Sequence, residues 1–589
     1  MAGASAGARS LVARGLSPEV LREIFRYLPI KTLKNLCLSC SLFRQIAAEF
    51  AFSWCTVYLH AINGLDVTRM KRILASSIVA IACVRDFAVV LDIESTSAIS
   101  KSRPGNPVVA ASLAERPEQE RLLLKVLVRL KASRLRSVSI TRHLLLTPET
   151  VFAIPKMHPN ITHLSIRPGR LVEFLNKPQH PQLDIPFINM TTTWHNLQHL
   201  SLDLRQRRIG YNVPGALHIA MEFISRNCAT LQSLAVEIDR TPPQLESSDG
   251  LHHLLSNVTS DTPGTESDWR PFLSREHTTF PTRLPVLTKL QLTGWPYLLR
   301  LQRLFARDLW QPSLLTVLRL DLCRFADKFM TNLADSLTGL KSLALSESCV
   351  WSTLAMVLPK LRPLDSLFLR FPCPEGQWTD YAEALRVHRE SLRFLWLECL
   401  HPDTEQARGA AERTLTESAA SSIAKMPRLE ELAIPEFLNW PQATFVSSKV
   451  LSARSPRILR VLSPPQTVIE QAFRETVVPV AAMRLLATAE VSGKVVTRLP
   501  NLQLVVFGAW KMGQTIEGTA GNTPKFWHIR YENDGGELAS VVENVTMADV
   551  RRLFPKSPIL NYDAGERDWV DVVDVEACST SRPCTACNQ

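Results

Sequence analysis

The sequence predicts an α/β fold: a short all-α unit over residues 16–55, followed by a solenoid of stacked strand–helix repeats over residues 56–510. Apolar residues spaced three and four apart near the N-terminus indicate helices. Further along, a Leu-x-x-Leu-x-Leu pattern recurs, and its alternation indicates strands with one buried face. Because no single repeat can bury its apolar face, we expect the repeats to stack, with parallel strands on the concave side and helices outside.

The first helix is predicted over residues 18–28. Ser17 can cap it, and Pro18 suits its first turn. Pro29 ends it, because proline lacks the backbone N–H that a helix interior needs. The apolar residues on one face of this helix are Leu21, Ile24, Phe25 and Leu28.

A second helix is predicted after the first, with Thr32 as its cap. Its apolar residues recur at spacings of three and four: Leu33, Leu36, Cys40 and Phe43. So short a segment carries more apolar surface than it can bury within itself. We therefore expect its apolar faces to dock on a partner protein or on the following domain.

The residues of this segment resemble an F-box. The family pattern begins Leu-Pro-x-Glu, continues with Ile-Phe-x-x-Leu-Pro and a Leu-rich helix, and ends with a Cys and an aromatic-Arg pair. Ser17 stands where the family usually has Pro, and Phe43 stands where Trp is common. The matching residues are Leu16, Glu19, Leu21, Ile24, Phe25, Leu28, Pro29, Leu33, Leu36, Cys40, Phe43 and Arg44.

The resemblance implies a non-catalytic adaptor of an SCF-type cullin–RING ubiquitin ligase. The F-box would dock on a Skp-type linker protein, which brings the cullin and RING subunits, and the rest of the chain would capture a protein substrate. Two alternatives stay open: the helices pack only on the next domain, or the protein is a scaffold that binds the linker without cullin. The residues expected at the linker interface and in its supporting core are Leu16, Pro18, Val20, Ile24, Leu28, Leu33, Leu36, Leu38 and Phe43.

The repeats follow this segment. In the middle of the chain their spacing is about 24–28 residues, the leucine-rich-repeat period, and elsewhere it is longer, so we expect an irregular leucine-rich-repeat solenoid. Together with the N-terminal segment, the repeats resemble fungal-type F-box proteins with C-terminal leucine-rich repeats. Copies start at Leu135, Ile161, Leu197, Leu231, Leu287, Leu315, Leu340, Leu364, Leu392 and Leu429, with a last copy at Leu502 and weaker ones at Val84 and Leu459. Between them, residues 326–337 and 351–361 read as helices.

Residues between the strand leucines are the predicted substrate contacts, because they would lie on the concave face. Four are singled out: Ser201, Arg319, Phe368 and Trp396. For Phe368 and Trp396, packing against neighbouring strands is an equal alternative.

Three other segments fall outside the repeats. Residues 1–15 are expected to be a disordered tail. Residues 240–283 are rich in Pro, Ser, Thr and Asp and are expected to be an inserted loop, either merely tolerated or in contact with a substrate. Residues 511–589 are expected to cap the solenoid, with a strand over 526–531, a helix over 547–554, and then an acidic tail. That tail also holds Cys578, Cys584 and Cys587, which are too few for a four-ligand zinc site.

Composition narrows the function classes. The net charge of +11 is spread over a long chain, and its basic clusters lack interleaved aromatic residues, so solvated faces are favoured over nucleic-acid binding. Twelve Cys without a disulfide framework suit a reducing compartment, so we expect the cytoplasm, the nucleus or both. No apolar stretch is long enough to span a membrane. No cofactor-binding or catalytic motif is found, although a site hidden near His528 stays as a further alternative.

Overall fold

The structure is a computed structural model that forms two compact units. Unit 1 holds residues 1–102, 108–282 and 578–589, and unit 2 holds residues 103–107 and 283–577. The predicted tail over 1–15, the insertion over 240–283 and the C-terminal cysteines lie outside the described residues. The structure describes residues 16–60, 63–76, 78–91, 111–112, 116–130, 134–141, 144–167, 196–204, 220, 223–224, 226–238, 284–295, 310–323, 326–346, 348–349, 351–372, 381–400, 422–423, 425–435, 456–462, 488–491, 494–497, 502–507, 525–534, 537–545, 549–550, 553–554 and 557–563.

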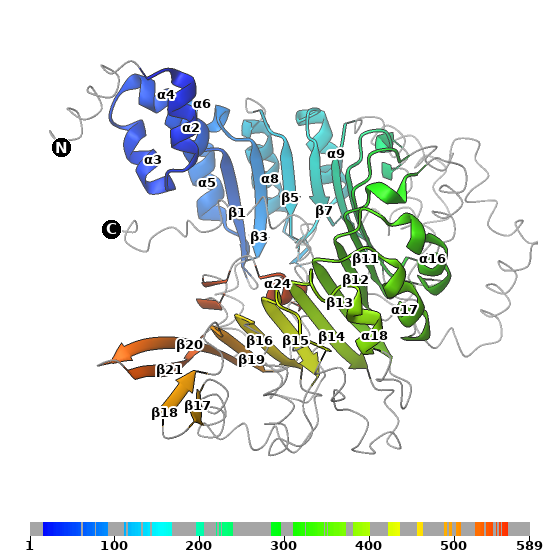
Figure 1. Ribbon diagram of the computed structural model, residues 1–589. Coiled ribbons are helices and arrows are strands. Elements are labelled where there is room, and N and C mark those ends of the chain that lie inside the picture. The colour runs from blue at the N-terminus through cyan, green and yellow to red at the C-terminus, as the bar shows by residue number, and fades with distance from the viewer. Residues whose placement is uncertain are drawn as a thin grey trace, which may run out of the picture. The chain divides into compact units, whose positions relative to one another are not determined.

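Unit 1 begins with three short helices, α2 (Pro18–Arg26), α3 (Ile30–Cys37) and α4 (Ser41–Ala51) (Figure 1). The predicted start of the first helix is confirmed. The hydroxyl of Ser17 accepts a hydrogen bond from the Val20 N–H at 3.4 Å, and Pro18 occupies the first turn. The Ser17 hydroxyl satisfies one of the unpaired N–H groups at the helix start, and Pro18 has no N–H that needs a partner.

The second predicted helix is two helices. Pro29, rather than Thr32, precedes α3, which ends at Cys37. The backbone is extended at Cys40, and its sulfur accepts a hydrogen bond from the Phe43 N–H at 3.4 Å, so Cys40 caps α4. Spacing alone could not reveal this break, because the apolar positions of both helices continue the same three-and-four pattern.

A small core holds these helices together. The rings of Phe25 and Phe43 meet edge to face, with centroids 5.4 Å apart. Cys83, which follows the three helices in the chain, packs against the same core, so the helices also contact the following part of unit 1. The buried members are Leu21, Phe25, Leu33, Cys37, Phe43, Ile46, Ala47 and Ala48.

The rest of unit 1 is a mostly parallel sheet with helices. The strand order is β2-β1-β3-β5-β7-β8-β9, and only the β1–β2 pair is antiparallel. A separate pair joins β4 (Ala111–Ser112) to β6 (Leu144–Leu145). The strands are β1 (Trp54–His60), β2 (Gly64–Leu65), β3 (Asp86–Leu91), β5 (Ser137–Ile140), β7 (His163–Ile166), β8 (His199–Asp203) and β9 (Ser233–Glu237). The helices are α5 (Val67–Ala75), α6 (Ile78–Ala82), α8 (Pro117–Leu130) and α9 (Pro148–Met157).

Unit 2 is built on a second run of parallel strands, β10 to β16 and then β19. Beyond β19 the sheet continues with two antiparallel strands, β20 and β21, and β17 pairs with β18 elsewhere. The parallel strands are β10 (Lys289–Thr293), β11 (Val317–Asp321), β12 (Ser342–Ser346), β13 (Ser366–Pro372), β14 (Phe394–Leu400), β15 (Glu431–Pro435), β16 (Ile458–Leu462) and β19 (Leu504–Phe507). The others are β17 (Thr488–Val491), β18 (Lys494–Thr497), β20 (Lys525–Asp534) and β21 (Glu537–Val545). The helices are α16 (Ala326–Leu333), α17 (Trp351–Val357), α18 (Tyr381–Arg386) and α24 (Pro558–Asp563).

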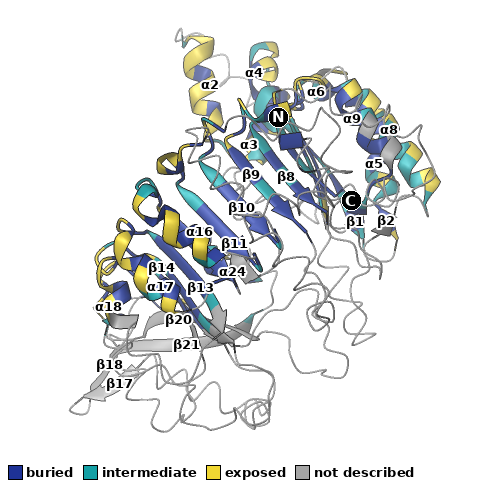
Figure 2. Ribbon diagram, turned by 90° about the vertical axis from the view of Figure 1, so that its right-hand side faces the viewer, coloured by how far each residue is buried: buried dark blue, intermediate teal, exposed yellow. Residues whose placement is uncertain are grey.

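The repeat pattern predicted the strands well. Each copy of the motif contains a strand that begins two residues after the first residue of the copy, as Leu315 precedes β11. The one exception is the weak copy at Leu459, where the strand begins at Ile458, one residue before the copy. Strands β10 to β14 are largely buried where their side chains are described, whereas α16 and α17 expose one side (Figure 2). The prediction of an α/β chain, with short N-terminal helices before mostly parallel strands, is therefore confirmed.

The two helices predicted between repeats are also present. Each is an α-helix that tightens into one 3₁₀ turn at its end: α16 continues to residue 336, and α17 continues to residue 360. Past residue 510 the predicted strand is the middle of β20, but its partner β21 and the helix α24 were not predicted.

Candidate protein-binding surfaces

Helix α2 is apolar on two faces. On one face, Leu21 and Phe25 lie in the core, with exposed fractions of 2% and 3%. On the other face, Val20, Ile24 and Tyr27 are 45%, 44% and 75% exposed. Their spacing of four and three places them along one side of the helix. A helix that is apolar on both sides needs something to cover its outer face.

Leu38 adds to this exposed surface. It caps the end of α3 and is 79% exposed. Pro18, at the start of α2, is also exposed. We refer to Pro18, Val20, Ile24, Tyr27 and Leu38 together as the outer residues.

The structure sorts the nine predicted linker-binding residues into three groups. Four are outer residues: Pro18, Val20, Ile24 and Leu38. Three are partly buried against the core of the helices: Leu16, Leu28 and Leu36. Two are core residues, Leu33 and Phe43, at 3% and 1% exposure. Sequence reasoning missed Tyr27, although its position three residues after Ile24 on the same helical side was a usable signal.

The two cysteines of this region are packing residues in this structure. Burial raises the pKa of the Cys37 thiol, which keeps it protonated and weakly nucleophilic. The Cys37 carbonyl accepts a hydrogen bond from Arg44 Nε at 3.0 Å, and Cys40 caps α4.

In unit 2, one residue from each strand forms a row across the sheet. The register aligns Arg319, Ala344, Phe368, Trp396, Ala433 and Arg460 on successive strands β11 to β16. We call these residues the central row. Since strand residues alternate between faces, the row lies on the face opposite the leucines that flank each member.

The side chains of the central row are buried, and three of them are predicted substrate contacts. Phe368 and Trp396 are 0% and 1% exposed and pack together with Ala344 and Ala433, the alternative left open for them. Arg319 is 3% exposed, and its Nε lies 2.7 Å from Asp321 Oδ2 in a buried ion pair. None of these three side chains offers a free surface in this structure.

A C-terminal segment covers part of the row. Ile559 of α24 is fully buried in the cluster of Ala344, Phe368, Trp396 and Ala433. Within the row, the guanidinium carbon of Arg460 lies 4.7 Å from the centroid of the Trp396 ring, in a cation–π contact. The covering segment lies more than 120 residues beyond β15, so strand periodicity carried no sign of it.

Glu431 links this segment to the sheet. Its Oε2 accepts hydrogen bonds from the Ser557 hydroxyl at 2.6 Å and the Ile559 N–H at 3.3 Å. Its Oε1 lies 2.6 Å from Arg457 Nη2. Burial raises the pKa of the Glu431 carboxyl, and the hydrogen bond from Ser557 and the charge of Arg457 oppose that shift.

Ser201, the fourth predicted substrate contact, lies in unit 1 and is half-buried on β8. In register beside it are Ser165 and Ala235, so this part of the sheet carries small side chains. Two residues before each serine on β7 and β8, the rings of His163 and His199 stack with centroids 4.0 Å apart. The role of Ser201 stays a prediction.

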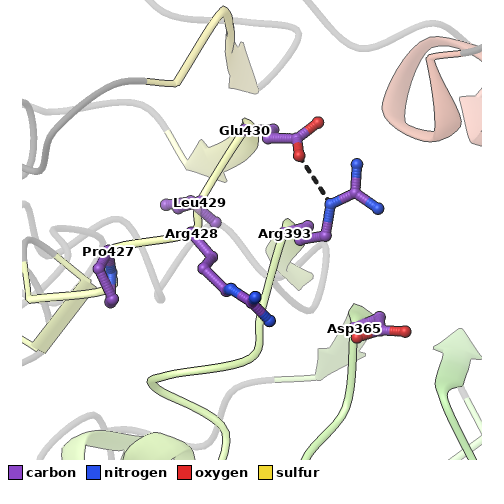
Figure 3. A pocket seen from close by; sticks show the side chains of 6 residues that line it. All are labelled: Asp365, Arg393, Pro427, Arg428, Leu429 and Glu430. Atoms are coloured by element: carbon purple, nitrogen blue, oxygen red, sulfur yellow. Dashed lines mark hydrogen bonds and ion pairs between the residues drawn. The ribbon is translucent and has the colours of Figure 1, made fainter.

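A pocket of about 510 Å³ lies at the N-terminal ends of β13, β14 and β15. Figure 3 shows Arg393 and Glu430 pointing toward one another, with Nε and Oε1 2.7 Å apart. That hydrogen bond raises the pKa of Arg393 above its already high ordinary value. Asp365 and Arg428 add one charge of each sign, and Pro427 and Leu429 complete the lining. This pocket is a surface feature with mixed charge and carries no functional assignment.

The region around His528 was the alternative location for an active site. The His528 ring lies 6.2 Å from the Phe554 ring in an edge-on arrangement. Among the described residues, no group of three or more His, Cys, Asp or Glu side chains is placed to hold a metal ion. Within the same residues, no helix has the length and apolar character needed to cross a membrane.

Comparison with known proteins identifies the N-terminal helices. Residues 15–54 match the F-box domain family. No curated protein matches the chain. F-box domains bind Skp-type linkers in SCF complexes, so the match implies a substrate-adaptor role in general terms. The three helices with the outer residues are therefore an F-box domain.

Proposed function

We propose that this protein is the substrate-recognition subunit of an SCF-type cullin–RING ubiquitin ligase. The observation that carries the proposal is the pair of apolar residues Val20 and Ile24 exposed on α2, together with Leu38, on a domain that matches the F-box family. Burying these side chains against a Skp-type linker would remove apolar surface from water. Leu33 and Phe43 would support the interface from the core.

The strand–helix repeats are the proposed substrate-capturing part. Their register and their spacing support leucine-rich repeats of the kind that follow an F-box in fungal-type proteins. Stacked repeats offer extended faces for binding other proteins. Ser201 remains a proposed contact on the sheet of unit 1.

In this role the chain contributes proximity. The RING subunit and a ubiquitin-charged conjugating enzyme perform the chemistry, and the adaptor holds a substrate lysine near them. Such tethering replaces a bimolecular encounter with a high effective concentration. The captured protein would be ubiquitinated and directed to the proteasome, in the cytoplasm or the nucleus.

Co-purification tests the proposal. The full chain is co-expressed with a Skp-type linker and cullin and is purified through a tag on this chain. We expect a stable three-part complex that Ile24→Asp removes. Recovery of linker without cullin would favour the scaffold alternative. Recovery of neither partner with a folded chain would contradict the proposal and leave the helices as packing elements.

A matched control is available in unit 1. Ile78 in α6 is 66% exposed and lies outside the F-box, so Ile78→Asp makes the same chemical change on another exposed helix. We expect this variant to keep both partners. Loss of binding in both variants would show a general effect of added charge rather than a linker interface.

A further inference from the structure

The sheet of unit 2 holds a short segment of its own chain as though it were a bound peptide. Ser557 and Ile559 are both 0% exposed, and α24 packs against β14 and β15. Ile559 fills the space bounded by Phe368 and Trp396 of the central row. The contact is between residues 126 or more positions apart in sequence.

Two different contacts identify the segment. One is apolar, the Ile559 side chain among the aromatic residues of the row. The other is polar: Glu431 accepts hydrogen bonds from the Ser557 hydroxyl and the Ile559 N–H. The Ser557 oxygen also accepts a hydrogen bond from the Leu560 N–H at 3.2 Å, so the same side chain caps the helix start.

The hydrogen bonds to Glu431 contribute more to the choice of segment than to stability. A buried carboxylate adds little to stability even when it is paired, because removing it from water is costly. It does discriminate strongly between segments, since a segment without a hydroxyl and an amide donor in the right places would leave it unsatisfied. Arg457 pairs with Oε1 of the Glu431 carboxylate, whereas Oε2 accepts its hydrogen bonds from Ser557 and Ile559 of the covering segment.

We propose that this face is a peptide-binding surface and that Ser557–Leu560 are an internal ligand that occupies it. The partner that fits is a protein segment at the start of a short helix, with a Ser or Thr hydroxyl two residues before an Ile or Leu. A phosphorylated hydroxyl would be rejected, because its negative charge would face the buried carboxylate of Glu431. The inference rests on the proposed function, in which the captured substrate supplies this segment and displaces the internal one.

Opening the surface in the full chain is the first step of the test. Ser557→Glu places a carboxylate against Glu431, whereas Ser557→Ala removes the hydroxyl without adding charge. Hydrogen exchange measured by mass spectrometry follows residues 557–563 and strands β13 to β15 separately. We expect residues 557–563 to lose protection in Ser557→Glu, more than in Ser557→Ala, while the strands stay protected.

The second step adds a labelled peptide with the sequence of residues 553–563. We expect the Ser557→Glu chain to bind it at least tenfold more tightly than the wild-type chain, where the internal segment competes at an effective concentration of about 1 mM. Peptides with Ile559→Asp or with phosphorylated Ser557 should bind at least tenfold more weakly.

Three results would overturn the inference. One is loss of protection in β13 to β15 together with residues 557–563, which would make the segment an integral part of the core. Another is unchanged protection of residues 557–563 in Ser557→Glu. The third is a released segment with no peptide binding at about 1 mM. Co-purification of linker and cullin with the same variant keeps failure of this inference separate from failure of the proposed function.

Discussion

Replacing Ile24 by Asp should abolish linker binding and leave the F-box folded. Ile24 is 44% exposed, so its substitution by a polar residue disturbs little of the core of the helices. Fully burying an isoleucine contributes about 1.5–3 kcal/mol, and less than half of this side chain remains to be buried, so Ile24→Ala should cost roughly 1 kcal/mol of binding. This corresponds to about a fivefold weaker Kd.

The aspartate adds a second cost. An unpaired carboxylate that is removed from water into an apolar interface costs about 3 kcal/mol or more. The sum of roughly 4 kcal/mol corresponds to about a thousandfold loss of affinity. Isothermal titration calorimetry of the purified linker into the full chain measures both variants, with Ile78→Asp as the matched control.

Leu21 provides the opposite case on the same helix. It is 2% exposed and faces the core, so Leu21→Ala should destabilise the F-box by about 2–5 kcal/mol. Its effect on binding would then follow from unfolding and be visible in thermal denaturation.

A folded Ile24→Asp chain whose Kd changes less than tenfold would refute the assignment of the outer residues to the linker interface.

Three further predictions concern stability. Burial raises the pKa of Asp86 from an ordinary 3.8 to about 6, although the charges of neighbouring arginines oppose the shift. Between these two pH values the folded state holds a proton that the unfolded state has lost, so the free energy of unfolding falls as the pH rises from 3.8 through 6. Thermal unfolding of Asp86→Asn should lack this fall, and an unchanged pH profile would contradict it. Burial lowers the pKa of His388 below its ordinary 6.5, so the unfolded state takes up a proton first and stability falls as the pH drops through 6.5; His388→Leu should lose this dependence in the same assay. It should also be less stable at every pH, because the ring bonds the Leu364 N–H. A Cβ on Gly339 would clash with the Ser313 carbonyl oxygen, so Gly339→Ala should destabilise the fold by about 1–3 kcal/mol, and an unchanged Tm would refute this.

The local elements were readable from the sequence. The strands of both units follow from the repeated leucines, because alternation along a strand depends only on neighbouring residues. The start of α2 follows from Ser17 and Pro18 for the same reason, since a helix cap acts within three residues. The break at Cys40 escaped prediction because a cysteine sulfur is an uncommon cap and the apolar spacing continues across it.

The two proposed binding surfaces depend on tertiary structure to different degrees. Ile24 and Leu21 both fit an amphipathic pattern, and only the packing of α2 on α4 decides that Leu21 is inside and Ile24 outside. For the central row, the sequence predicted which residues share a face but not what lies on it. That was decided by Ser557 and Ile559, more than 120 residues away, because burial depends on contacts between distant segments that no local pattern records.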